Sequence, residues 1–320
     1  MRRKGSPFQG VGAVAVKEMS DHLSSARMFV LELLVVLTAA AALYAAIDRL
    51  RQTTAEDPFL LLRLFTVDRS PLPSFVAILG FLIPLMAIGL GFDAINGEHN
   101  RRTLSRILAQ PIYRDALLIG KFLAGLATLA ISLTALWLLV LGSGLIFLGV
   151  PPGGEEIARS LVFLVIAVFY AGVWLALAML LSIVFRSAAT AALVALGIWL
   201  FLTVLWPMLA PAFAQIIAPP DPRYAALGLD TPDTGLWTQF LMRISPNELF
   251  AEAMQAVLSP GTRTLGAVFL EQLRGAVMGA PLPLGESMLI AWPQTVGLIA
   301  GTIVLFVIGY VVFQRQEVRA

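Results

Sequence analysis

The sequence predicts an all-α, polytopic membrane protein with six transmembrane helices. Hydrophobic residues make up 58% of its 320 residues and charged residues only 13%, about half the charged share of a soluble domain. Six apolar segments are long enough to cross a bilayer, which takes about 20 residues. Each must be helical, because an isolated strand leaves its backbone groups unpaired in lipid. The predicted spans are Met28 to Ile47, Phe75 to Phe92, part of Leu117 to Val150, Leu161 to Phe185, Ala188 to Leu209 and Met288 to Phe313.

The charge distribution predicts the orientation. An even number of spans places both termini on one side of the membrane. If that side is the cytoplasm, its segments carry 13 basic and 6 acidic residues, and the opposite side carries 9 basic and 13 acidic residues. Excess Lys and Arg on the cytoplasmic side is the pattern of the positive-inside rule. We therefore expect a single transmembrane domain over residues 1–320 in the plasma (inner) membrane, with both termini cytoplasmic.

The segment before the first span predicts an amphipathic helix from Phe8 to Ser25. Such a helix lies in the headgroup plane of the membrane. The alternative is a simple lead-in to the first span. The predicted apolar face consists of Phe8, Val11, Ala15, Met19 and Leu23.

A short basic segment, residues 96–113, joins the second and third spans. Leu104, Ile107 and Leu108 predict a short amphipathic helix that Pro111 ends. A short helix held between two spans on the basic side suits docking to a cytoplasmic partner. The alternative is an ordinary positive-inside loop whose arginines only hold the topology.

Three acidic residues near the predicted spans need an explanation. Glu32 lies about one turn inside the first span, where a charge is costly. It is either a polar contact with another helix or partner, or a carboxylate that reaches the interface and pairs with Arg27 or Lys17. Asp93 and Glu98 flank the end of the second span, as solvated boundary charges or as acids that face a partner.

The region from Ala210 to Ser287 is predicted to be a long external helical insertion before the last span. Several prolines divide it into short pieces. Ser245 followed by Glu248 is a capping box, which predicts a helix from Asn247 to Leu258. A second helix is predicted at about Thr264 to Met278.

Several kinds of chemistry have no sequence support. The chain has no Cys, two His and three Lys, and it lacks the Gly-rich phosphate-binding loop that ends in Lys. Zinc-protease and nucleophile-elbow motifs are also missing. We therefore predict no catalytic residue, no metal or cofactor site and no nucleic-acid partner, and we expect ATP, if used, to be bound by a separate subunit.

The stretch FDAINGEHNRRTLSRILAQPIYRDALLIGKFLAG resembles export-type ABC transporter permeases. In that pattern an Asp and a Glu follow the second span, a Thr-Leu helix, a Pro and an Arg come next, and Gly-Lys opens the third span. The stretch RISPNELFAEAMQAVLSPGTRTLG is similar to the multi-copper enzyme maturation (NosY-like) subgroup. The corresponding residues are Asp93, Glu98, Thr103, Leu104, Pro111, Arg114, Gly120 and Lys121, with Arg102 where the family often has Gly.

The resemblance implies a type V, ABCG-like exporter half. Two permease chains, identical or homologous, would pair in the membrane above two copies of a cytoplasmic ABC ATPase. Residues 96–113 would be the coupling helix, residues 8–25 the connecting helix, and the external helices an outer gate or a dock for an extracytoplasmic protein. The expected ATPase-coupling residues are Asp93, Glu98, Arg101, Arg102, Thr103, Leu104, Arg106, Pro111 and Arg114.

Two functions therefore compete. The first is a permease subunit that couples ATP hydrolysis to substrate export. The second is a permease-like scaffold that transmits motion to an external partner without moving a solute. An ion-driven carrier is disfavoured, because it needs buried acids or broken helices at the midplane, and copper as a direct cargo lacks Cys ligands.

Overall fold

The computed structural model describes residues 10–51, 59–70, 72–100, 114–149, 151–221, 231–265 and 281–315. Within these ranges the regular structure is helical, and six helices are long and apolar enough to cross a membrane. The predicted all-helical class and number of spans are confirmed. The spans are formed by α2 (Ala26–Arg51), α4 (Phe75–Gly91), α7 (Arg114–Leu148), α8 (Gly154–Val184), α9 (Ala188–Leu200) with its continuation α10 (Trp206–Ile217), and α15 (Leu284–Arg315).

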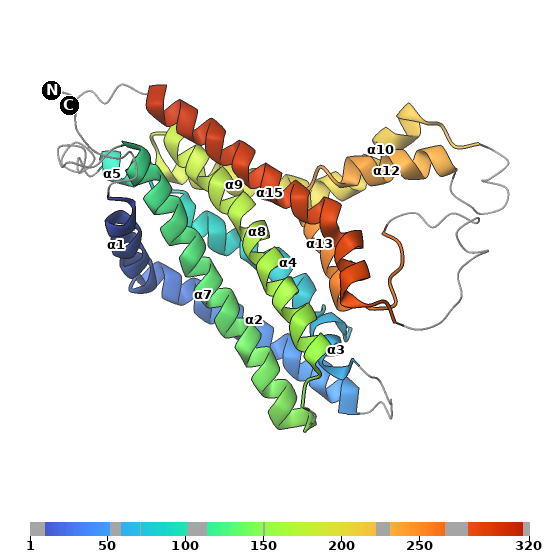
Figure 1. The fold of residues 1–320 in the computed structure, drawn as a ribbon. Coiled ribbons are helices and arrows are strands. Elements are labelled where there is room, and N and C mark those ends of the chain that lie inside the picture. Colours follow the sequence, from blue (N-terminus) through green and yellow to red (C-terminus); the bar gives the residue numbers. More distant parts are fainter. Residues whose placement is uncertain are drawn as a thin grey trace.

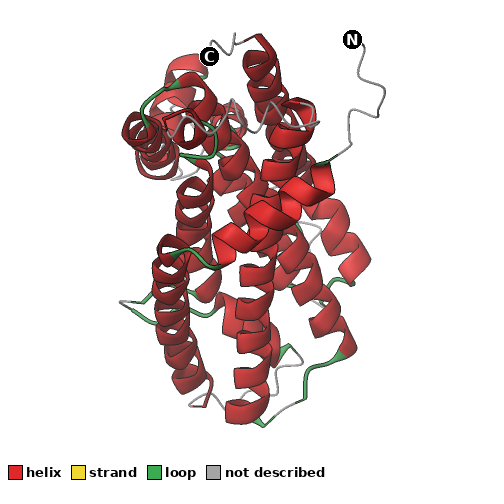
Figure 2. Cartoon of the chain, turned by 90° about the vertical axis from the view of Figure 1, so that its left-hand side faces the viewer, coloured by secondary structure: helices red, strands yellow, loops and turns green. Residues whose placement is uncertain are grey.

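Helix α8 is the centre of the bundle. It packs against α15, α4, α7 and the shorter α13 (Pro246–Leu258), and the long helices run side by side in both views (Figures 1 and 2). Phe163, Tyr170 and Trp174 of α8 are fully buried. The central helix therefore supplies large side chains to most of the internal contacts.

Small residues set a close helix contact between α4 and α8. A Cβ added at Gly91 would lie 2.8 Å from the Cβ of Ala178 and 3.2 Å from the carbonyl oxygen of Leu175. Helices in lipid associate through such small residues, because packing rather than a hydrophobic drive holds them together. Gly91 therefore serves helix packing at this position.

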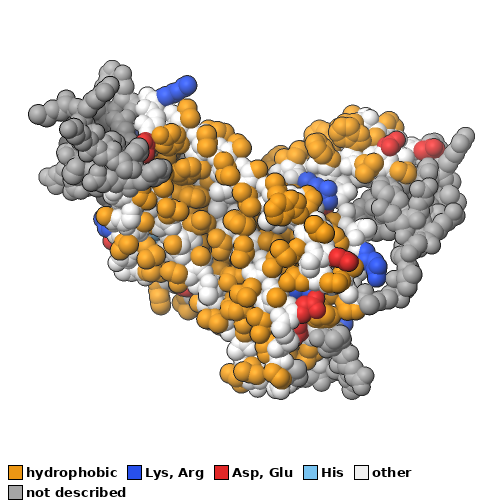
Figure 3. Space-filling view, in the orientation of Figure 1, with side chains coloured by type: hydrophobic (Ala, Val, Ile, Leu, Met, Phe, Trp, Pro, Cys, Tyr) orange, Lys and Arg blue, Asp and Glu red, His pale blue; other side chains and the backbone are white. Residues whose placement is uncertain are grey.

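The outer surface of the bundle is apolar. Ile146, Leu193 and Leu289 are each more than two-thirds exposed, and Figure 3 shows hydrophobic side chains covering the long helices while charged ones lie mostly near their ends. An exposed apolar surface of this extent is foreign to a soluble monomer. The chain is therefore a multi-pass membrane protein.

The predicted first helix is present, but its buried face is different. Helix α1 spans Val11–Leu23, and its buried residues are Val14 and Glu18. Leu23, expected on the apolar face, is 45% exposed. Val11, Ala15 and Met19 of the predicted face are half-buried, while Val14 and Glu18 are buried because α1 packs on α7, where a basic residue of α7 compensates the charge of Glu18.

The fifth span is longer than predicted. It runs from Ala188 to Ile217 and contains a π-helical turn, η1 (Phe201–Leu205). The predicted start of the external region at Ala210 therefore falls inside α10. Figure 1 shows α10 and α12 (Pro232–Met242) projecting together to one side of the bundle.

The predicted helix at Asn247 to Leu258 is confirmed as α13, but its capping box is wrong. The Ser245 side chain makes no capping hydrogen bond. Its hydroxyl instead donates to the carbonyl oxygen of Leu202 in η1, at 3.0 Å, a partner remote in sequence. Most of the helix predicted at Thr264 to Met278 lies outside the described residues.

One buried helix was not predicted. Helix α3 (Leu60–Thr66) lies in the loop between the first two spans, with Leu61, Leu62, Leu64 and Phe65 buried. The Glu156 side chain accepts a hydrogen bond from the Leu61 backbone N–H at 2.8 Å. This short helix is held against α8 by a contact that is remote in sequence.

Candidate functional site

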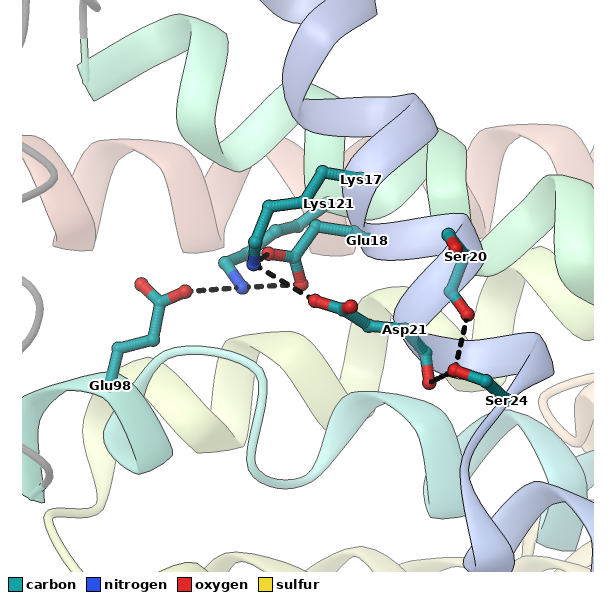
Figure 4. Close-up of polar contacts among 7 residues, drawn as sticks. All are labelled: Lys17, Glu18, Ser20, Asp21, Ser24, Glu98 and Lys121. Atoms are coloured by element: carbon teal, nitrogen blue, oxygen red, sulfur yellow. Dashed lines mark hydrogen bonds and ion pairs between the residues drawn. The ribbon is translucent and has the colours of Figure 1, made fainter.

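A buried ion-pair cluster lies where α1, α5 (Asn96–Asn100) and α7 meet. We use the name Lys121 cluster for Lys17, Glu18, Glu98 and Lys121. The Nζ of Lys121 lies 2.8 Å from Oε2 of Glu18 and 2.7 Å from Oε1 of Glu98. Figure 4 shows the ammonium between the two carboxylates. One cation thus joins three helices.

Burial makes this contact strong. The Lys121 side chain is 5% exposed, and Glu18 and Glu98 are 12% and 15% exposed. A charge removed from water must be paired, and removing one partner of a buried pair costs about 3–5 kcal/mol. The sequence pattern places Lys121 among Leu, Ile, Gly and Phe, and the paired carboxylates are what make that position tolerable.

Glu18 is the most strongly coupled carboxylate of the cluster. Burial alone favours its protonated form, but the charge and hydrogen bond of Lys121, with those of Lys17, hold the pKa of Glu18 below its ordinary value. Lys17 lies 2.9 Å from Glu18 and 3.0 Å from Asp21. Partial burial opposes the charge of Lys17, but these two carboxylates raise its pKa above the ordinary value. Both groups are therefore charged at neutral pH.

A second ion pair ties α2 to the end of the second span. Arg27 lies 2.9 Å from Asp93, and its guanidinium stacks over the ring of Phe92, 5.0 Å from the ring centroid. With the Lys121 cluster this pair lines a cavity of about 270 Å³ that also includes His22. Burial lowers the pKa of His22, which keeps the ring neutral at pH 7.

Hydrogen bonds fix the start of α5 to the hairpin between α8 and α9. The hydroxyl of Ser182 accepts from the backbone N–H groups of Ile95 and Asn96, at 3.0 and 3.2 Å. The Asn96 amide donates to the carbonyl oxygen of Phe185 at 3.2 Å, and the Asn100 amide donates to that of Arg186 at 3.1 Å. The entrance to residues 101–113 is therefore tied to α1, α7 and α8.

The structure places only some of the expected site residues. Asp93 and Glu98 lie at this site, each in an ion pair. The side chain of Arg114, at the start of α7, is outside the described residues, and so are the remaining expected coupling residues, Arg101, Arg102, Thr103, Leu104, Arg106 and Pro111.

Glu32 lies apart from this site. Its side chain is half-buried in α2, and among the described residues no hydrogen bond or ion pair joins it to Arg27 or Lys17. Those cations pair with Asp93 and with Glu18 and Asp21. The interpretation that Glu32 pairs with either of them is wrong, because both cations have closer carboxylates.

Sequence reasoning identified Lys121 only as part of a family pattern, and it placed Glu18 on no site. The signal that points to both is a basic residue flanked by apolar residues at the start of a span, since such a charge needs a carboxylate partner. Among the described residues, no group of three or more His, Asp or Glu side chains is arranged to hold a metal ion.

Comparison with known families identifies this architecture. Residues 12–318 match the model of the ABC-2 family transporter protein. The chain belongs to this family. Members are membrane subunits without an ATPase domain, and ABC permeases pair with ATPase subunits. The chain is therefore a permease subunit of an ABC transporter.

Two curated proteins of this family are similar to the chain. Both are described as a probable ABC transporter permease protein NosY. The protein from Stutzerimonas stutzeri is 24% identical over 309 residues, covering 95% of this chain and 97% of the relative. The protein from Pseudomonas aeruginosa is 28% identical over 204 residues, covering 62% of this chain and 68% of the relative.

Proposed function

We propose that this chain couples ATP hydrolysis by a separate cytoplasmic ATPase to export of a substrate across the plasma membrane. Residues 96–113 act as the coupling helix and residues 8–25 as the connecting helix, both at the cytoplasmic face with the two termini. Two ATPase subunits and a second permease chain, identical or homologous, complete the assembly. The region beyond α10, up to residue 287, lies outside the cell.

The observation that carries this proposal is the position of Lys121. It binds Glu98, near the start of the proposed coupling helix, and Glu18 in the middle of α1. Because separating these buried charges costs about 3–5 kcal/mol, a displacement of α5 is transmitted to α1 and α7. The hydrogen bonds of Asn96 and Asn100 extend the same displacement to α8 and α9.

The test is Lys121→Met, which keeps the length of the side chain and removes its charge. In the complex with its ATPase, we expect the ATPase to co-purify while permease-dependent stimulation of ATP hydrolysis is lost. Arg49→Met is the control, because Arg49 lies outside the Lys121 cluster and is 56% exposed in its pair with Asp68, and an exposed ion pair contributes only about 0–1 kcal/mol. Full stimulation in Lys121→Met would contradict the coupling route.

A second variant tests direct contact with the ATPase. Glu98 is the acidic residue within residues 96–113, so Glu98→Lys reverses a charge of the proposed docking segment. We expect the ATPase to dissociate or its hydrolysis to become uncoupled. If co-purification and stimulated hydrolysis were both unchanged, residues 96–113 would not be the docking helix.

The force-transmitting scaffold is the second candidate, and the packing of α13 favours it. Arg159 of α8 donates to the carbonyl oxygen of Val257 at the end of α13, at 2.8 Å. Glu252 of α13 accepts from Gln294 of α15, also at 2.8 Å. Movement of α8 and α15 therefore carries α13, and with it any external partner.

Cysteine labelling separates the two candidates, because the chain has no native Cys. Phe81→Cys reports on the interior of the second span, and Thr262→Cys on the segment after α13. A permease predicts that a water-soluble thiol reagent reaches position 81 in one nucleotide state. A scaffold predicts nucleotide-dependent labelling at position 262 alone.

A further inference from the structure

A cavity of about 410 Å³ lies between α4, η1 and α13, at the end of the bundle opposite α1. Its walls include Val76, Phe81, Phe250 and Met254. Ala77, Ala251 and Gln255 also line the cavity and are exposed, so it is open on one side. A concave, mostly apolar site with a few polar groups is the usual form of a small-molecule site.

The polar groups of this cavity are uncharged. They belong to Thr66, Ser74, Thr203, Asn247, Gln255 and Ser259. No lysine, arginine, aspartate or glutamate lines it among the described residues. An ion bound there would lack a counter-charge, and burying an unpaired ion is costly. The cavity therefore selects against charged ligands.

Thr203 has an unused hydroxyl at this cavity. Threonines inside membrane helices usually donate to the carbonyl four residues earlier, and five others beyond the first turn of their spans do so here. The Thr203 oxygen is buried and has no partner among the described residues. Its position in the π-helical turn removes it from the regular pattern. The five are Thr38, Thr128, Thr134, Thr295 and Thr302.

Asn247 supplies a second polar group. Its Oδ1 accepts a hydrogen bond from the hydroxyl of Tyr170 at 2.8 Å, which fixes the side chain at the start of α13. The Tyr170 ring stacks on Phe250, with centroids 4.5 Å apart. The amide nitrogen of Asn247 has no hydrogen bond to the described residues, so a donor remains for a ligand.

From these groups we propose that the cavity binds a neutral amphiphile: an apolar body against Phe81, Phe250 and Met254, with an uncharged carbonyl or hydroxyl group at Thr203 and Asn247. A buried hydroxyl without a partner destabilises the fold, and such a ligand satisfies it. Helical π-turns occur frequently at functional sites, and here the turn is what frees the hydroxyl. Binding to this cavity does not depend on the proposed coupling route, since it is measured without ATP hydrolysis.

The experiment uses the full chain in phosphatidylcholine nanodiscs with three photo-crosslinkable probes. They are a ten-carbon alcohol, a diacylglycerol and a ten-carbon carboxylate, and mass spectrometry maps the labelled peptides. We expect the neutral probes to label residues 74–81 and 247–259, and the carboxylate to label them much less. Labelling by the diacylglycerol identifies the ligand as a membrane lipid, and labelling by the alcohol alone identifies it as a single-chain molecule.

Two variants test the site without damaging the fold. Ala251→Phe fills the cavity from an exposed position and should abolish labelling, whereas Ala212→Phe on α10, also exposed, should not. Thr203→Val should lower the apparent affinity about fivefold, the value of one hydrogen bond, and Thr203→Ser should retain it. Thr38→Val is the matched control, because the Thr38 hydroxyl is already satisfied by its own helix.

The Thr203→Val variant also gives a result that does not depend on a ligand. Removing an unpaired buried hydroxyl should raise the melting temperature of the ligand-free chain while it weakens probe labelling. Equal labelling by the carboxylate, or labelling unchanged in Ala251→Phe and Thr203→Val, would overturn the proposal. Failure of the Lys121 coupling test would leave these results unaffected.

Discussion

Replacing Arg159 is expected to release α13 from the bundle. The Arg159 side chain is fully buried and donates to the carbonyl oxygens of Val257 and Leu282, to the hydroxyl of Ser287 at 3.1 Å, and to Glu155. These partners belong to α8, to the end of α13, to the segment just before α15 and to the start of α15. One guanidinium therefore connects segments that lie up to 128 residues apart in the chain.

The magnitude follows from what Arg159→Met leaves behind. The carbonyl oxygens of Val257 and Leu282 each lose a donor, at about 1–3 kcal/mol for a buried group. The ion pair with Glu155 adds little, because Glu155 is 43% exposed and solvent screens it to under about 1 kcal/mol. The expected loss is about 2–6 kcal/mol, the combined cost of the two carbonyl groups.

Unfolding of the purified chain by SDS in mixed micelles, followed by circular dichroism, measures this loss. Arg159→Lys keeps the charge but not the planar fork of five donors, so it should lose about half as much stability. Arg49→Met is the control, because Arg49 is 56% exposed in its pair with Asp68 and should cost less than about 1 kcal/mol. A loss in Arg159→Met no larger than in this control would refute the reasoning.

Three further predictions concern α1 and the interior. The lowered pKa of Glu18 contributes stability that is complete above its ordinary pKa of 4.5 and is lost as pH falls through the lower folded value. Protease cleavage of α1 should therefore increase only at acidic pH. Glu18→Gln should remove this pH dependence. Gly120→Ala places a Cβ 2.8 Å from the Val14 side chain and should increase protease cleavage at α1. Gly142→Ala is the control, because nothing lies within 4 Å of its new Cβ. It should stabilise α7 by up to about 1 kcal/mol in SDS titration. Tyr170→Phe removes the hydroxyl that donates to Gly80 and Asn247. It should cost about 1–2 kcal/mol of unfolding free energy in the same titration. An unchanged unfolding midpoint would show that this hydroxyl adds no stability.

The six spans could be predicted from the sequence because the bilayer imposes its own length and polarity on each segment. A run such as Leu161 to Phe185 has to be a helix wherever it lies in the bundle. The predicted spans Leu161 to Phe185 and Ala188 to Leu209 leave only Arg186 and Ser187 between them, and α8 and α9 flank these two residues. These features depend on local composition and on a solvent that is the same for every membrane protein.

The buried face of α1, the π-turn and the missing capping box were decided by tertiary contacts. Glu18 is buried only because Lys121, 103 residues later, lies opposite it, and no periodicity within α1 contains that information. The local sequence around Ser245 fits a cap, yet its hydroxyl donates to the carbonyl of Leu202, 43 residues earlier, and makes no capping hydrogen bond.

The sequence by itself therefore determined the class of protein, the number of spans and the lack of an ATPase motif. Tertiary structure alone decided which charges are paired and where the uncharged cavity lies. The physical reason is that hydrophobicity is a property of each segment, whereas a buried ion pair or a cavity exists only when residues remote in sequence come together.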